Sequence, residues 1–272
     1  MRLNLLGVRG STPAPGESFT RYGGNTSCVT VTPSGASHPT LTLDAGTGLR
    51  SLSALLDGQA YDGAILISHL HWDHMHGLPF FTAGDRDDSN VQVYVPAQNG
   101  QSGEELLAQS MSPPSFPITP AGLKGSWTFT AVEPGAYTIG SLSVIAAEVR
   151  HKGGRTFGYR ISDGGHDIAY LPDHVAHGPI TPALERLVQG VDLLVHDAQF
   201  LEKERQFADA YGHSTVDDAI ELAVNLGVGR LLLFHHSPVR TDDQLDAIAA
   251  GIDSPVPVEI AREGHILDVP LR

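Results

Sequence analysis

The sequence predicts an α/β fold in which two mixed β-sheets carry helices on their outer faces. Short β-branched and apolar runs, typical of buried strands, recur along the 272 residues. These runs come in groups with helical patterns interspersed, which indicates two layered sheets. No internal repeat occurs and no linker is long enough to divide the chain. We therefore expect a single domain over residues 1–272.

The expected elements follow from these patterns. Strands are expected at 3–6, 27–32, 40–44, 64–68 and 91–95, then after a proline-rich stretch at 127–132, 142–149, 156–161 and 167–171, and finally at 192–196, 230–234, 258–261 and 266–269. Helices are expected at 48–56, 103–109, 182–189, 215–226 and 241–250. The proline-rich segment 110–120 cannot form a regular ladder. It either lines the mouth of a site and holds an apolar group of a substrate, or is a plain surface crossover.

Composition narrows the class of protein. The formal net charge of −14 argues against general nucleic-acid binding, which needs a basic face to displace counterions. It leaves an anionic substrate open, because divalent ions would make a site locally positive. The single cysteine, Cys28, excludes an internal disulfide and a cysteine zinc knuckle. The N-terminus resembles a strand rather than a secretion signal, and no run has the length of a membrane span. We expect a cytoplasmic protein without a membrane partner.

The segment 69–74 (HLHWDH) carries the strongest chemical signal, and it follows directly on an expected strand. In extended backbone, residues two apart point to the same side, so His69 and His71 can converge on one ion. The chain then turns, which brings Asp73 and His74 close by at a different angle. This geometry suits two adjacent ions, and imidazole and carboxylate donors favour zinc, iron or manganese over calcium or magnesium. A solvated histidine-rich loop is the competing interpretation, which four donors at this spacing disfavour.

Three further donors stand just past the carboxyl ends of expected strands, namely His151, Asp173 and His235. Strand-borne donors in this position collect on one edge of a layered fold. Each alone is a weak signal, since a lone histidine after a strand is more often a surface residue. Together they supply the three missing ligands of a two-metal site.

The order His-x-His-x-Asp-His, His, Asp, His resembles the metallo-β-lactamase fold superfamily over essentially the whole chain. The resemblance implies an αββα sandwich with two divalent metal ions, zinc or manganese with iron as a third choice, at one edge of the sheets. The implied ligands are His69, His71 and His151 for the first ion, Asp73, His74 and His235 for the second, and Asp173 as the bridge. His236 competes with His235, which we prefer because His-x-Ser resembles that ligand's setting in ribonuclease Z and related phosphodiesterases.

Further segments resemble the phosphodiesterase branch of this superfamily. Residues 44–48 (DAGTG) resemble the glycine-bearing loop ahead of the metal motif, and 195–200 (VHDAQF) resemble the His-Glu-Ala-Thr-Phe segment of ribonuclease Z. Residues 212–215 (GHST) resemble the segment with its proton-donating histidine, which true β-lactamases, glyoxalase II enzymes and acyl-homoserine lactonases lack. The stretch 156–159 (TFGY) resembles the cyclic-phosphate phosphodiesterase of phosphonate degradation. One departure is His174, beside the implied bridge, where many relatives have threonine.

The implied activity is a phosphodiesterase acting on a small cyclic or linear phosphodiester, nucleotide-like or otherwise. A metal-bridging hydroxide would attack phosphorus, with Asp73 as a catalytic orienting group and His213 as the general acid. Ribonuclease Z has a long tRNA-gripping arm between its third histidine and its bridging aspartate, whereas residues 152–172 here fit only a plain hairpin. We therefore expect tRNA and long nucleic acids not to be partners, and a metal-dependent nuclease for long RNA or DNA stays open only as an alternative that the net charge and the hairpin disfavour. A homodimer is left open.

Substrate contacts are expected from Arg155, Tyr159 and Ser214, with Lys152 and Arg240 as further candidates. Ser214 or Thr215 is the expected cap of the helix 215–226, whose N-terminus suits a phosphate oxygen. Asp197 is expected to orient either His213 or a metal-bound histidine. Two alternatives to a phosphodiesterase stay open. A lactone, thioester or ester hydrolase on the same metals would depend little on His213, and a metal-bound sensor without turnover would have no use for it.

Overall fold

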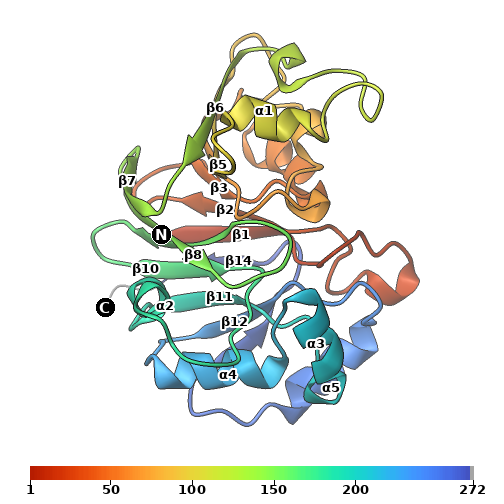
Figure 1. Ribbon diagram of the computed structural model, residues 1–272, viewed down its shortest axis with the longest axis vertical. Coiled ribbons are helices and arrows are strands. Elements are labelled where there is room, and N and C mark those ends of the chain that lie inside the picture. Colours follow the sequence, from red (N-terminus) through yellow and green to blue (C-terminus); the bar gives the residue numbers. More distant parts are fainter. Residues whose placement is uncertain (270–272) are drawn as a thin grey trace.

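Two seven-stranded β-sheets pack against each other in this computed structural model, which describes residues 1–269 (Figure 1). The first sheet has the order β14 (Ile266–Asp268), β1 (Arg2–Gly7), β2 (Cys28–Thr32), β3 (Leu41–Leu43), β4 (Asp62–Leu66), β5 (Asn90–Pro96) and β6 (Ser126–Val132). Its strands from β14 to β3 pair antiparallel, whereas those from β3 to β6 pair parallel. The sheet is therefore mixed, as expected.

The second sheet repeats this mixed arrangement. Its order is β13 (Val258–Ile260), β12 (Leu231–Phe234), β11 (Leu193–Asp197), β10 (Asp167–Leu171), β9 (Thr156–Ser162), β8 (Leu142–Val149) and β7 (Gly135–Ile139). Strands from β10 to β13 pair parallel, and those from β10 to β7 pair antiparallel. Because β8 and β10 both run antiparallel to β9, the strands β8, β10, β11 and β12 all end at the same edge.

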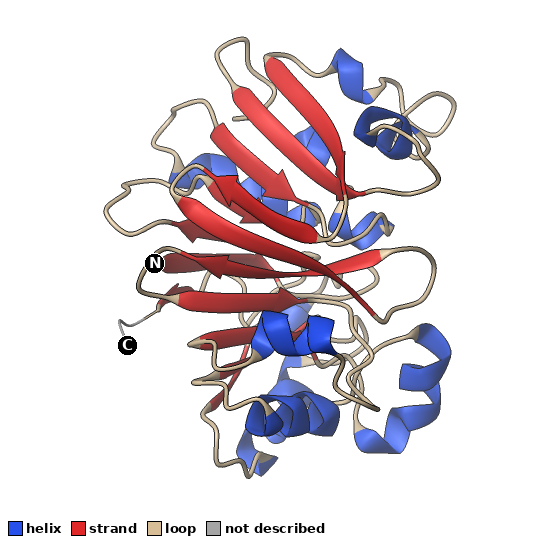
Figure 2. Ribbon diagram, turned by 60° about the vertical axis from the view of Figure 1, so that its left-hand side comes forward, coloured by secondary structure: helices blue, strands red, loops and turns tan. Residues whose placement is uncertain are grey.

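Helices cover the outer faces of both sheets (Figure 2). The 3₁₀ segment η2 (Thr47–Leu55) and α1 (Gly103–Ala108) cover the first sheet, and α2 (Pro182–Val188), α4 (Val216–Asn225) and α5 (Asp242–Gly251) cover the second. Further elements are α3 (Arg205–Tyr211) and the 3₁₀ turns η1 (Glu17–Phe19), η3 (Trp72–His74), η4 (Leu78–Phe80), η5 (Pro120–Gly122) and η6 (Glu202–Glu204).

Alternation of side chains explains why the sheets pack. Inward residues such as Leu3, Val29, Phe157 and Val195 are fully buried and form one core between the sheets, because successive strand residues face opposite sides. The predicted αββα sandwich is confirmed. Within residues 1–269, the sequence patterns missed β7 and α3, and the expected helix at 48–56 is a 3₁₀ segment. No described helix combines the length and apolarity needed to cross a membrane.

Candidate functional site

The sequence-predicted donors meet at one edge of the sandwich. Segment 69–74 follows β4, His151 follows β8, Asp173 follows β10, and His235 follows β12. The last three strands end at the same edge of the second sheet, and β4 of the first sheet delivers its segment to them. All seven predicted metal donors therefore lie close together.

One group of donors combines three histidines and a carboxylate. His69 Nε2 lies 2.8 Å from His71 Nδ1, and His151 Nε2 lies 3.3 Å from that same atom. Asp173 Oδ2 lies 3.6 Å from His69 Nε2 and 3.4 Å from His151 Nε2. Each residue offers a ligand atom within 4.8 Å of the others.

A second group lies against the other oxygen of Asp173. His74 Nε2 and His235 Nε2 each lie 3.1 Å from Asp173 Oδ1. Asp73 Oδ2 lies 3.3 Å from His74 Nε2 and 3.1 Å from His235 Nε2. The two groups thus share Asp173, which presents one oxygen to each.

Unsatisfied buried atoms test whether these residues fit a metal. His74 Nε2 and Asp173 Oδ1 are buried and lie 3.1 Å apart, yet neither has a hydrogen-bond partner among the described residues. Buried polar atoms are nearly always paired, so these two atoms are expected to bind a further group, such as a metal ion. Nitrogen and carboxylate oxygen at this spacing are donors for zinc or manganese. The residues fit a divalent metal.

The electrostatics of the first donor group, with Asp173, also suit cation binding. Burial lowers the pKa of His69 well below its usual value, and burial likewise lowers the pKa of His71 and His151. Burial would raise the pKa of Asp173, but His235 and His74 hold it well below its usual range. Neutral imidazoles and an ionised carboxylate are the forms that bind metal.

Asp44 supports the site from beneath, and sequence reasoning gave it no role. Its Oδ2 lies 2.7 Å from His74 Nδ1 and accepts hydrogen bonds from Tyr170 Oη and Ser68 Oγ, both at 2.9 Å. Its Oδ1 accepts from the Ser68 N–H at 2.6 Å. A carboxylate on the far nitrogen of a ligand histidine fixes the ring and its tautomer. An aspartate that directly follows a buried strand, in the DAGTG loop, was the available signal.

A close backbone approach encloses the second group. The Ser11 N–H donates to Asp73 Oδ2 at 2.7 Å. A Cβ at Gly10 would lie 2.4 Å from His235 Nδ1, so only glycine fits there. His235 itself has a positive φ of 58°, which turns the chain just after β12. The loop after β1 therefore helps to place Asp73 and His235.

His213 lies beside the shared carboxylate and is held by Asp197. Its Nδ1 donates to Asp197 Oδ2 at 2.8 Å and lies 3.8 Å from Asp173 Oδ2. Burial alone would lower the pKa of His213, but the Asp197 carboxylate outweighs it and raises the pKa to about 9. Between the two roles left open for Asp197, the geometry favours orientation of His213.

Two cavities open onto these donors. One of about 360 Å³ is lined by Ser11, Leu70, His71, Trp72, Asp73, Asp173 and His213. A second of about 470 Å³ shares Ser11, His71 and His213, and adds His151, Lys152, Gly153, Gln199, Phe200, Tyr211, Ser237 and Pro238. His213 thus faces both, and a substrate has room on either side of the donor groups.

His236, His174 and His76 are among the histidines that lie outside the donor groups. His236 Nε2 donates to the Ala261 carbonyl at 2.8 Å, so the geometry favours His235 over His236 as a ligand. His174 Nδ1 lies 3.0 Å from His196 Nε2, and its ring faces that histidine rather than the donors. His76 stacks on Trp72 with ring centroids 5.4 Å apart.

The structure does not fit two of the expected substrate contacts. Tyr159 is fully buried and its hydroxyl donates to the Ile67 carbonyl at 2.7 Å. Ser214 is also fully buried, and its Oγ donates to the His174 carbonyl. Both expectations overlooked that these residues belong to the packed interior, where a substrate cannot reach them.

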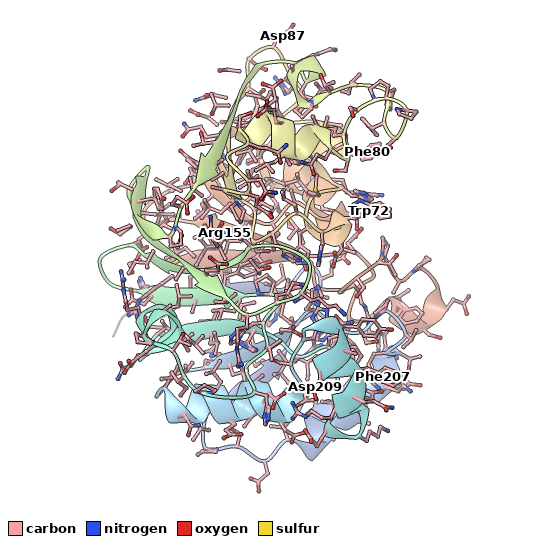
Figure 3. The ribbon with its side chains drawn as sticks, viewed as in Figure 1. Trp72, Phe80, Asp87, Arg155, Phe207 and Asp209 are labelled. Carbon is pink, nitrogen blue, oxygen red and sulfur yellow. The ribbon has the colours of Figure 1, made fainter. Side chains whose placement is uncertain are left out.

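Arg155 is already paired. Its guanidinium contacts Glu133 at 2.9 Å, Glu148 at 3.1 Å and the Ala97 carbonyl. Figure 3 shows Arg155 on the β7 side of the molecule, away from Trp72 in that view. Two carboxylates leave its charge largely neutralised, so it does not fit a phosphate contact.

The expected phosphate site at the helix N-terminus is closed. Thr215, not Ser214, caps α4, and its side chain and Asp218 bond each other's backbone N–H groups. Arg205 then pairs with Asp218 at 2.6 Å. Arg240 is buried and pairs with Glu204. Among the expected cationic contacts, only Lys152 lines a cavity over the donors.

Comparison with known proteins places this geometry in a family. A family model described as a beta-lactamase superfamily domain matches residues 39–236. A ribonuclease Z of Listeria monocytogenes is 27% identical over 222 residues, covering 64% of this chain and 70% of the relative. Human tRNase Z, short form, has a similar structure, with a TM-score of 0.71 at 20% identity over 100% of both chains. A diphosphatase of the PhnP family gives a TM-score of 0.70 at 21% identity, over 99% of this chain and 98% of that one.

The expectation that disfavours tRNA and long nucleic acids as partners is wrong. It depended on the net charge and on the short hairpin at 152–172, yet relatives named ribonuclease Z align over most of their length. The charge of the whole chain does not fix the field at the site, because bound divalent ions bring their own positive charge.

The expected resemblance to the metallo-β-lactamase fold superfamily is confirmed. The matched residues make up more than half of the chain and contain the whole of both donor groups. This chain belongs to the beta-lactamase superfamily and is a metal-dependent hydrolase with the metallo-β-lactamase fold.

Proposed function

We propose that the chain is a phosphodiesterase that holds two divalent ions, zinc or manganese, with iron also suited to the donors. His69, His71 and His151 would hold one ion, Asp73, His74 and His235 the other, and Asp173 would contact both. The observation that carries the proposal is that two donor groups share Asp173, with His213 beside them. We further propose that residues 1–272 act as a single hydrolase domain.

The ions, when bound, supply an activated water near neutral pH and neutralise the charge of a phosphodiester. The protein's own residues supply orientation and the proton. Because Asp197 accepts from His213 Nδ1, Nε2 is the nitrogen left to carry a proton toward the cavities. A departing alkoxide needs that proton, so His213 acts as general acid. Asp73, fixed by the Ser11 N–H, orients the reacting groups.

A phosphodiester is favoured over a carboxylic ester or lactone by the proton donor. Loss of an alkoxide from phosphorus benefits from a general acid, and His213 lines both cavities over the donor groups. The names of the similar proteins, ribonuclease Z, tRNase Z and a diphosphatase, also point to bonds at phosphorus. Small cyclic or linear phosphodiesters and RNA ends therefore both belong among the substrates to test.

The test compares zinc- and manganese-reconstituted protein on three substrates. These are bis(p-nitrophenyl) phosphate, a nucleoside 2′,3′-cyclic phosphate and a tRNA with a 3′ extension. His213→Ala should lower turnover about 100-fold or more where the leaving group is an alkoxide, and less for p-nitrophenolate, which needs no proton. His177→Ala, at an exposed histidine, is the matched control and should leave turnover unchanged.

Two results would contradict the proposed function or its mechanism. No turnover of any phosphodiester, in protein with a full metal content, would overturn the proposal and direct attention to lactones and thioesters. Equal activity of His213→Ala on all leaving groups would remove the general acid from the mechanism.

A further inference from the structure

A third and larger cavity lies beside the donor site, with a volume of about 760 Å³. Its apolar wall comes from two segments, with Met75, Leu78 and Phe80 on one side and Met111 and Phe116 on the other. Phe80 and Phe116 meet edge to face with ring centroids 6.0 Å apart. A volume of this size with mostly apolar walls is typical of a small-molecule site.

The cavity lies next to the donor site, because neighbouring residues of two segments line the two cavities. Trp72 lines the cavity over Asp73, and it stacks on His76, which lines the apolar cavity. In the loop after β1, Ser11 lines the cavity over Asp73, and Pro13 lines the apolar cavity. Figure 3 shows Trp72 and Phe80 on the same side of the molecule.

The charge around this cavity is unusual for so acidic a chain. The sequence has 31 acidic and 17 basic residues, yet no aspartate or glutamate is among the described residues that line the cavity. Arg50 is the one arginine or lysine among them. Its guanidinium is exposed and makes no ion pair or hydrogen bond within residues 1–269. An apolar cavity with one unpaired guanidinium complements an apolar group that ends in an anion.

We propose that this cavity binds the organic group of the substrate, and that this group is an amphiphilic anion with an aromatic or aliphatic body. The body would lie between Met75, Phe80 and Phe116, and its carboxylate or phosphate would pair with Arg50. The assignment as a substrate subsite rests on the proposed phosphodiesterase function. It also gives the proline-rich segment 110–120 the first of its two expected roles, that of a loop holding an apolar group.

Binding can be measured without turnover by a matched pair of fluorescent probes. The anion 8-anilinonaphthalene-1-sulfonate and the uncharged N-phenyl-1-naphthylamine differ by one sulfonate. Phe116→Ala should weaken both about tenfold, because it removes a wall of the cavity. Arg50→Gln should weaken only the anion, by about fivefold. Phe207→Ala and Arg230→Gln, at positions outside this cavity, are the matched controls.

A kinetic experiment tests whether the apolar cavity binds part of the substrate. Two p-nitrophenyl phosphodiesters are compared, one with a methyl group and one with a carboxynaphthyl group as the second ester. Phe116→Ala should raise KM for the naphthyl ester about tenfold and leave the methyl ester unchanged. Phe116→Leu, which keeps an apolar side chain, should restore most of the binding, and circular dichroism checks that each variant is folded.

The outcomes separate the two proposals. If neither Phe116→Ala nor Arg50→Gln changes the affinity for the probes, the subsite proposal is overturned, whether or not the protein turns over a phosphodiester. Turnover in which both esters respond equally to Phe116→Ala overturns it as well. The expected binding pattern without turnover of any phosphodiester supports an amphiphile site and overturns the phosphodiesterase instead.

Discussion

Asp44 and Asp197 are fully buried aspartates whose importance comes from the histidines they orient. Asp44 contacts His74 in the second donor group, and Asp197 contacts His213. Neither is itself in a donor group. Their carboxylates act through the histidine rings, and substitutions at the two should therefore give different signatures.

Asp44→Asn should lower affinity for the ion that we propose for the second donor group about 10–100-fold. An amide has one acceptor oxygen, so with that oxygen toward His74 its NH2 group would face the Ser68 N–H, which now donates to Asp44 Oδ1. Competition with a chromophoric chelator measures this affinity directly. Asp209→Asn removes the same charge from the exposed face of α3 and should change nothing (Figure 3). Unchanged metal affinity in Asp44→Asn would remove Asp44 from the site.

Asp197→Asn should leave metal content unchanged and lower kcat about 10–100-fold on substrates with alkoxide leaving groups. Its amide would present N–H groups toward the His213 ring and the His174 N–H. The loss should shrink when the leaving group is p-nitrophenolate. A uniform loss across leaving groups, or a loss of metal, would contradict the assigned role.

At the scale of elements, the start of α4 holds the turn that carries His213. Thr215 caps the helix, Asp218 completes the capping box, and Arg205 of α3 pairs with Asp218. The neighbouring helix α5 has the same box, built by Thr241 and Gln244, but carries no donor or cavity-facing residue near His213. The two caps therefore form a natural pair for comparison.

Thr215→Ala and Thr241→Ala should each cost about 1 kcal/mol of stability and lower Tm by about 2–4 °C. Only Thr215→Ala should also lower kcat, by about threefold, because it loosens the position of His213. Thermal unfolding followed by circular dichroism and steady-state kinetics measure the two effects. Equal kcat in both variants would show that the cap serves the helix alone.

At the scale of the whole molecule, Asp163 joins the two sheets. It follows β9 in the second sheet, and its Oδ2 accepts from the N–H and Oγ of Ser34, which follows β2 in the first. Its Oδ1 lies 3.1 Å from His166 Nδ1. Burial would raise the pKa of Asp163, but these hydrogen bonds lower it to about 2.

Because this pKa is lower in the folded state, the Asp163 carboxylate stabilises the fold above the ordinary aspartate pKa of about 4. That stability should be lost as the pH falls from about 4 to about 2. Asp163→Asn should lower Tm at pH 7 by about 2–4 °C and have a smaller effect at pH 3. Thermal unfolding at both pH values checks this. A Tm difference that is independent of pH would contradict it.

Much of this protein was predictable because its donors belong to local patterns. Segment 69–74 and the positions of His151, Asp173 and His235 directly after strands can be read from sequence alone, since strand periodicity marks where each strand ends and which way its side chains point. The two mixed sheets and the outer helices follow from the same periodicity. The weak points were β7, α3 and the substrate contacts, where short or polar segments carry little periodic signal.

The tertiary structure alone decided matters that depend on residues distant in the chain. It brought His235 rather than His236 to the donors, oriented His213 by Asp197, and placed Asp44 under His74. It buried Tyr159 and assembled the apolar cavity around Arg50. Sequence spacing fixes which way a side chain points along its own strand, whereas packing between strands and loops decides which side chains it meets.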